Sequence, residues 1–169
     1  LASSYEHWIE EKLVSDPKMS DLAFASEIGG NVIAKCREAL GRISAGINLL
    51  ATNDLAFDAF CFMNRAMILQ RNIMNYSKKH GAGIECSFQD FVDPRNPQND
   101  FGWRPFQIAF ILMNLSAMVD PHHADRNIVD LLYFPTGGGK TEAYLGLMAF
   151  VIANRRLHAN SGDSFNRDG

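Results

Sequence analysis

The glycine-rich turn at residues 135–141, "PTGGGKT", constrains the fold more than any other part of this sequence. The apolar run "IVDLLYF" precedes the turn, and the helical pattern of "EAYLGLMAF" follows it. A short apolar run bounded by loops is typical of a buried parallel strand, which is covered by helices on both faces. The order strand, turn and helix therefore predicts an α/β fold, in which this turn begins a P-loop domain with a parallel sheet.

The residue types in the turn suit the binding of ATP and Mg²⁺. Glycines permit positive φ angles and remove Cβ atoms that would block a phosphate, so N–H groups at the start of the helix can surround it. The Lys140 ammonium would hold phosphate oxygens, and the Thr141 hydroxyl would coordinate Mg²⁺, which makes both candidate catalytic residues. Glu142 suits the first helical turn and is a candidate for positioning a Mg²⁺-bound water. The predicted cofactor site in this stretch comprises Thr136, Gly137, Gly138, Gly139, Lys140, Thr141 and Glu142.

The strict P-loop pattern GxxxxGK[ST] is not met, because Phe134 occupies the first glycine position. The turn instead resembles motif I of superfamily 2 helicases and translocases, A/P-T-G-x-G-K-T, which tolerates this change. The stretch "WRPFQ" at residues 103–107 resembles their upstream motif of arginine, proline, an aromatic residue and glutamine. This resemblance implies that Arg104 and Gln107 belong to the cofactor site and that Gln107 binds adenine. A glutamine amide offers the donor and the acceptor that the adenine N6/N7 edge needs.

A narrower resemblance covers roughly residues 20–157. The stretches "FMNRAMILQR", "RPFQIAFILMNL" and "FPTGGGKTEAYLGL" look like the DrmA family, the helicase-like proteins of DISARM anti-phage systems. This resemblance implies a large, multidomain bacterial ATPase that acts on DNA in the cytoplasm together with a partner protein. It is also the only basis for expecting a role in phage defence.

Part of the machinery for ATP hydrolysis is not visible in the sequence. Superfamily 2 motors need a Walker B carboxylate pair and an arginine from a second RecA-like domain, but the chain has no Asp-Glu dipeptide. Asp130 precedes the glycine turn instead of following it. The sequence starts at Leu1 without a methionine and ends in a polar stretch, so we expect a segment of a longer motor that is inactive when isolated.

Helical periodicity and helix breakers give an expected order of elements. Asn53 or Asp54 can cap the third helix, and Pro105 suits the first turn of the fourth. Helices are predicted at residues 5–13, 21–50, 54–77, 104–119 and 140–157, with the second and third forming an antiparallel hairpin. The predicted parts are a helical accessory domain at 1–80, a connector at 81–101, the first part of a RecA-like domain at 102–157 and a flexible end at 158–169.

Composition narrows the range of functions. A net charge of −3 gives no sign of a strongly basic nucleic-acid surface. Three widely spaced cysteines without a CxxC pair indicate reduced thiols. No apolar run approaches the ~20 residues that span a bilayer, so no membrane partner is expected.

Some individual residues are of types found in binding sites, but their spacing does not favour that role. The adjacent His122 and His123 have no third spaced ligand, which disfavours a metal site. The cations in and just after the third helix have a spacing that favours a solvated face over a nucleic-acid path. They are Arg65, Arg71, Lys78 and Lys79.

Two other functions stay open. A nucleotide kinase or another P-loop NTPase would need an acceptor lid and basic residues after the last helix, where only twelve residues remain. A helical interaction module could carry the glycine turn as a structural or vestigial nucleotide site. Replacing Lys140 with alanine separates the motor from the interaction module, because the intact motor would lose its ATP-dependent activity and a pure scaffold would change little.

Overall fold

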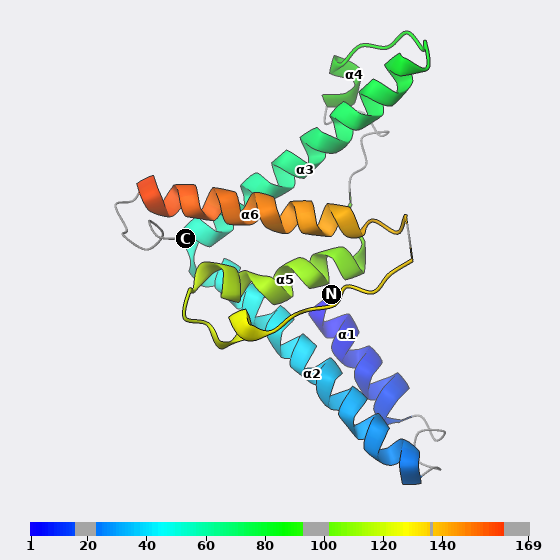
Figure 1. Cartoon of the computed structure of the whole chain (residues 1–169), viewed down its shortest axis with the longest axis vertical. Coiled ribbons are helices and arrows are strands. Elements are labelled where there is room, and N and C mark those ends of the chain that lie inside the picture. Colours follow the sequence, from blue (N-terminus) through cyan, green and yellow to red (C-terminus); the bar gives the residue numbers. More distant parts are fainter. Residues whose placement is uncertain (16–22, 93–101, 136, 161–169) are drawn as a thin grey trace.

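The computed structural model describes residues 1–15, 23–92, 102–135 and 137–160 (Figure 1). Within these ranges the chain is helical, and no strand forms. A π-helical turn, η1 (Ile9–Val14), continues the first helix, and a 3-10 turn, η4 (Ala124–Asn127), follows the fifth. The α-helices are α1 (Ala2–Trp8), α2 (Ala23–Thr52), α3 (Asp54–Gly81), α4 (Gln89–Val92), α5 (Pro105–Val119) and α6 (Lys140–Asn160).

The predicted helices all form, with ends that differ by a few residues. Asn53 is the N-cap of α3, and its side-chain oxygen accepts the N–H of Ala56 at 2.9 Å. Pro105 begins α5 as expected, because its missing N–H is not needed in a first turn. Helix α6 continues three residues beyond its predicted end at Leu157, into the expected flexible end. The short α4 was not predicted, and most of the predicted connector, 93–101, lies outside the described residues.

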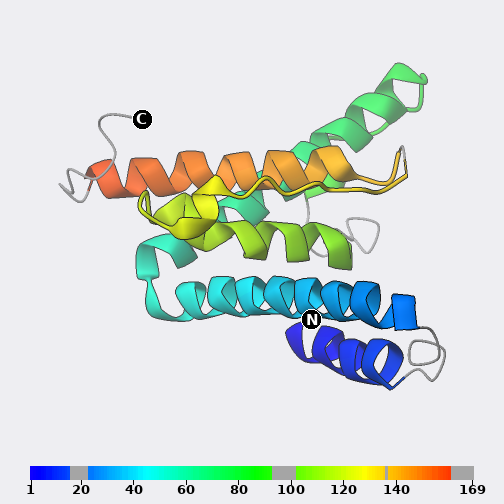
Figure 2. The ribbon, with the colours of Figure 1, turned by 60° about the horizontal axis from the view of Figure 1, so that its bottom comes forward.

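The long helices are arranged in successive layers. Helix α2 packs along α5, α5 packs against α6, and α6 packs along α3. Figure 2 shows α1, α2, α5 and α6 stacked in this order, with α3 crossing the stack. Helices α2 and α3 meet at the Asn53 turn and then diverge (Figure 1). They therefore do not form the predicted antiparallel hairpin, because each packs along a different helix of the C-terminal half.

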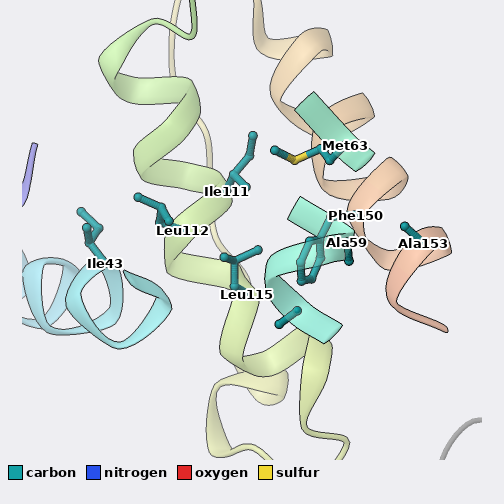
Figure 3. Close-up of a cluster of buried hydrophobic side chains, with 9 residues drawn as sticks. Ile43, Ala59, Met63, Ile111, Leu112, Leu115, Phe150 and Ala153 are labelled. Atoms are coloured by element: carbon teal, nitrogen blue, oxygen red, sulfur yellow. The ribbon is translucent and has the colours of Figure 1, made fainter. Parts of the chain in front are cut away.

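One hydrophobic core holds these layers together (Figure 3). It takes side chains from both predicted domains, so the two halves share their interior. Helix α2 approaches α5 very closely at Gly46, where an added Cβ would lie 2.1 Å from the carbonyl oxygen of Leu112. The core consists of Ile43, Ala56, Ala59, Met63, Ile111, Leu112, Leu115, Phe150 and Ala153.

The predicted strand before the glycine turn is the main correction to the sequence interpretation. Residues 128–135 run beside α5 and α6 without helix or strand structure (Figure 2). Val129, Leu131 and Tyr133 are 94%, 87% and 90% exposed. A strand needs another strand to bond its N–H and C=O groups, and the described part of the chain offers none. The predicted α/β domain is therefore not seen, and the described fold is helical.

Candidate nucleotide-binding site

The glycine turn has the backbone geometry that its sequence predicts. Gly137 and Gly139 have φ angles of 77° and 91°, in the left-handed region that favours glycine. At Gly138 the constraint is space, because an added Cβ would lie 2.3 Å from a ring carbon of Phe134. Each of the three positions therefore requires a glycine. Thr136, the remaining predicted residue of this turn, lies outside the described residues.

Phe134 anchors the turn to α5. Its ring stacks on Phe106 with 4.1 Å between the ring centroids and 14° between the planes. This contact explains why a large aromatic residue, and not glycine, stands at the first position of the strict P-loop pattern. The sequence did not reveal the pair, because nothing local places a residue of α5 under the turn.

Arg104 and Gln107 both bind the main chain of the turn. An Arg104 guanidinium N–H donates to the carbonyl oxygen of Gly138 at 2.7 Å, and Gln107 Nε2 donates to that of Gly139 at 2.7 Å. The Gln107 Oε1 accepts the N–H of Arg104 at 2.8 Å, which caps α5. The arginine–proline–aromatic–glutamine motif therefore holds the glycine turn onto the start of α5.

The predicted role of Gln107 in binding adenine remains a prediction. An amide group carries two N–H donors and two acceptor lone pairs, so the two bonds to the main chain leave one of each. The side chain is only 6% exposed. A nucleotide base could therefore reach it from one side alone, through the cavity described below.

Trp103 is a structural anchor in this arrangement. Its Nε1 donates to the Asn64 side-chain oxygen on α3 at 2.7 Å. Its ring lies against α6 at Gly146, where an added Cβ would be 2.7 Å from the ring. Trp103 thereby fixes the position of α3 relative to the start of α6, next to the glycine turn.

Lys140 and Thr141 stand at the start of α6, as predicted. The Lys140 ammonium donates to the carbonyl oxygens of Phe134 and Pro135 within the same turn. Thr141 is an exposed residue. The first N–H groups of a helix have no acceptor within the helix, so this end of α6 can offer donors and positive charge to an anion.

A cavity of about 220 Å³ lies where the turn, the start of α5 and the middle of α3 meet. It brings together the two motifs that the sequence singled out. It also includes Arg71 of α3, whose spacing in the sequence predicted a place on a solvated face. No local signal marks Arg71, because only the packing of α3 on α6 brings it here. The lining residues are Arg71, Gly102, Arg104, Gln107, Gly137, Gly139 and Glu142.

A charged cluster ties the segment before the turn to α2. Arg42 makes two hydrogen bonds to the Asp130 carboxylate, at 2.8 and 2.7 Å, and its Nε lies 3.0 Å from a carboxylate oxygen of Asp125. These three side chains are 11%, 19% and 20% exposed. The hydrogen bonds from Arg42 lower the pKa of Asp130, and the same bonds raise the pKa of Arg42.

One residue of the histidine pair has a structural role. His123 Nδ1 accepts the N–H of Asp125 at 3.2 Å and so caps the turn η4. Across the described ranges, no three His, Cys, Asp or Glu side chains come close enough together to hold a metal ion. In the same ranges, no helix combines the length and the apolar character needed to cross a membrane.

Comparison with known proteins relates the chain to a segment of one much longer bacterial protein. No protein-family model matches the sequence. The whole chain aligns over 171 residues, at 43% identity, with a component of a DISARM system. That relative is DISARM protein DrmA of Bacillus paralicheniformis, and the chain spans 14% of its length. The chain is therefore a homologue of DrmA over a small part of that protein.

Proposed function

We propose that this chain is the P-loop segment of an ATP-dependent helicase or translocase of superfamily 2 type. It would act on DNA in the bacterial cytoplasm as part of a DISARM-like defence system, together with a partner protein. The observation that carries the proposal is the pair of left-handed glycines, Gly137 and Gly139, directly before Lys140 and Thr141 at the start of α6. The homology to DrmA along the whole chain supports the biological setting.

The hydrogen bonds that Arg104 and Gln107 make to the glycine turn support a phosphate site on the opposite side of the turn. In a trans peptide the C=O and the next N–H point in opposite directions. Arg104 and Gln107 bind the carbonyls of Gly138 and Gly139, so the following N–H groups, of Gly139 and Lys140, are directed away from them. These donors and the N-terminus of α6 would hold the phosphates of ATP.

Lys140 and Thr141 would complete the cofactor site. Phosphate oxygens would replace the carbonyl oxygens that the Lys140 ammonium now contacts, because a charged acceptor forms the stronger bond. Thr141, exposed on the second residue of α6, would supply a hydroxyl to Mg²⁺. Bound Mg²⁺ neutralises charge on the phosphates, while the carboxylates needed for hydrolysis would come from elsewhere in the protein.

The exposed segment at 128–135 supports the parallel sheet that such a motor needs. Val129, Leu131 and Tyr133 alternate along the chain and leave large apolar surfaces in solvent. The outer side of α6 is also apolar and exposed at Leu145 and Met148. We propose that this segment becomes a strand when it pairs with strands from the rest of the protein, and that α6 then packs on the sheet.

The proposal is tested by ATP hydrolysis in the full-length protein. Hydrolysis stimulated by DNA is expected for the wild type, and Lys140→Ala should reduce it by roughly 100-fold or more, as expected when a group that stabilises phosphoryl transfer is removed. Lys35→Ala is a matched control, because Lys35 is an exposed lysine of α2 that forms an i,i+3 ion pair with Glu38. Hydrolysis by Lys140→Ala at the wild-type rate would rule the proposal out.

One observation favours a second candidate, a helical interaction module with a vestigial site. The Lys140 ammonium is already bonded to carbonyl oxygens of its own turn, which could be its only role. In that case neither wild type nor Lys140→Ala would bind ATP, and defence against phage would be equal in the two strains.

A further inference from the structure

We propose that Arg71 of α3 stacks on the purine base of the nucleotide whose adenine Gln107 is predicted to bind, in the cavity beside the glycine turn. This inference rests on the proposed function, because it assigns a residue to the same nucleotide site. Arg71 lies in the N-terminal half of the chain, some 70 residues before Lys140, and no sequence motif connects the two.

The direction of the N–H groups in the turn places the phosphates outside this cavity. Its lining includes Arg104 and Gln107, which bind the carbonyl side of the turn. The N–H groups of Gly139 and Lys140 therefore point away from these two side chains, and phosphates follow the N–H groups. The Glu142 carboxylate in the lining would repel a phosphate, whereas the Arg71 and Arg104 guanidiniums would attract one. The charges alone therefore do not decide the matter, and the direction of the N–H groups does.

The same lining suits a base and a ribose. A carboxylate such as that of Glu142 accepts hydrogen bonds from an amino group or a ribose hydroxyl. Gln107 keeps one N–H donor and one lone pair for the edge of a base. The volume of about 220 Å³ is below the ~300–1,000 Å³ typical of pockets for whole drug-sized ligands, which suits one end of a nucleotide.

Arg71 supplies the planar group that stacks on a base. A guanidinium is flat, weakly hydrated and permanently charged, and it stacks on aromatic faces where a lysine ammonium does not. Arg71 is an exposed residue and also lines a second cavity, of about 380 Å³, along α3. Its side chain is thus open to a ligand, while the packing of α3 on α6 and the Trp103–Asn64 hydrogen bond fix its backbone.

The position of Arg71 also gives the nucleotide a contact with the N-terminal half of the chain. Helix α3 runs from the shared core to the short α4 at the far end of the molecule (Figure 1). Tyr76 and Phe91 meet edge to face there, with 5.8 Å between the ring centroids. A base held by Arg71 would thereby join α3 to the glycine turn.

The test compares two ligands, ATP and inorganic tripolyphosphate, by calorimetry on the full-length protein. Arg71→Ala should weaken the binding of ATP by roughly tenfold, the size of a stacking contact, and leave tripolyphosphate binding unchanged. Arg71→Lys should weaken ATP binding nearly as much, because the charge remains but the planar group is lost. Arg65→Ala is the matched control, since Arg65 is an exposed cation of the same helix outside both cavities, and it should bind ATP like the wild type.

The outcomes separate this inference from the proposed function. Lys140→Ala should weaken the binding of both ligands. If Lys140→Ala does so but Arg71→Ala binds ATP like the wild type, the nucleotide site stands and the role of Arg71 is refuted. Equal loss of ATP and tripolyphosphate binding in Arg71→Ala would also refute it, because Arg71 would then act on phosphates. A wild-type protein that binds neither ligand refutes the proposed function, and this inference with it.

Discussion

Helix α5 and the segment at 128–135 are both apolar in sequence and have opposite surroundings. Ile111 and Leu115 of α5 are fully buried, whereas Val129 and Tyr133 of the segment are about nine-tenths exposed. A helix bonds its N–H and C=O groups internally, so one apolar face against a neighbour is enough to fix it. An extended segment bonds only to another strand. The difference shows that a helix needs only one packed face, whereas an extended segment without a neighbouring strand leaves its apolar side chains in solvent.

The largest expected effect is in the helical core. Phe150 of α6 is fully buried between α3 and α5 (Figure 3). Phe150→Ala would remove this ring from the shared core and leave a cavity. We expect the free energy of unfolding to fall by about 3–5 kcal/mol, measured by urea denaturation.

Val129→Ala is the matching truncation on the extended segment at 128–135, for comparison with Phe150→Ala in the core. Val129 is 94% exposed, so its truncation should change the stability of this chain by less than about 0.5 kcal/mol. In the full-length protein the same change should cost more, because the proposed sheet would bury Val129. Equal, small effects in both proteins would contradict pairing of this segment.

The next largest loss of stability is expected from the ion pairs that connect the segment at 128–135 to the helices. Arg42→Met would leave the Asp125 and Asp130 carboxylates, each about one-fifth exposed, without their cation. Loss of one partner of a largely buried ion pair costs about 3 kcal/mol, and we expect a loss of this size at neutral pH. Arg37→Met is the matched control, because the Arg37–Glu10 pair is about half exposed and should contribute less than about 1 kcal/mol.

The dependence of this effect on pH has a definite sign. Arg42 holds the pKa of Asp130 below its ordinary value of 3.8. A carboxyl group whose pKa is lowered in the folded state stabilises the fold at every pH above its ordinary pKa. This stabilisation is lost as the pH falls through the lowered pKa. The stability difference between wild type and Arg42→Met should therefore be constant above about pH 5 and shrink at more acid pH. A difference that does not change on acidification would mean that Arg42 acts through packing alone.

Local sequence was sufficient to predict the helices and the glycine turn. The spacing of apolar residues, the Asn53 cap and Pro105 at the start of α5 are signals within a few residues of the elements that they define. The left-handed Gly137 and Gly139 follow in the same way from a turn before a helix. These predictions succeeded because the energies that decide them are local.

The rest of the site depends on contacts between distant residues. Phe134 meets Phe106, Arg104 and Gln107 meet the turn, and Arg71 reaches the cavity, all through helix packing. A single sequence does not show which helix faces which. The predicted hairpin failed for this reason, and the predicted strand failed because no other strand forms in the described part of the chain to bond it.

Two glycines of α2 provide a direct test of the helix packing. Gly46→Ala would place a Cβ against the main-chain carbonyl of Leu112, which cannot move without shifting α5. Forcing α2 and α5 apart should cost about 2 kcal/mol, within the range for overpacked cores. Gly41→Ala on the same helix has no neighbour within 4 Å, so the better helix propensity of alanine should stabilise the chain by about 0.5–1 kcal/mol. Opposite signs from the same substitution, measured by urea denaturation, are expected only if α2 lies on α5 at Gly46. Stabilisation by both changes would show that the two helices do not meet there, and that the shared core does not extend across α2.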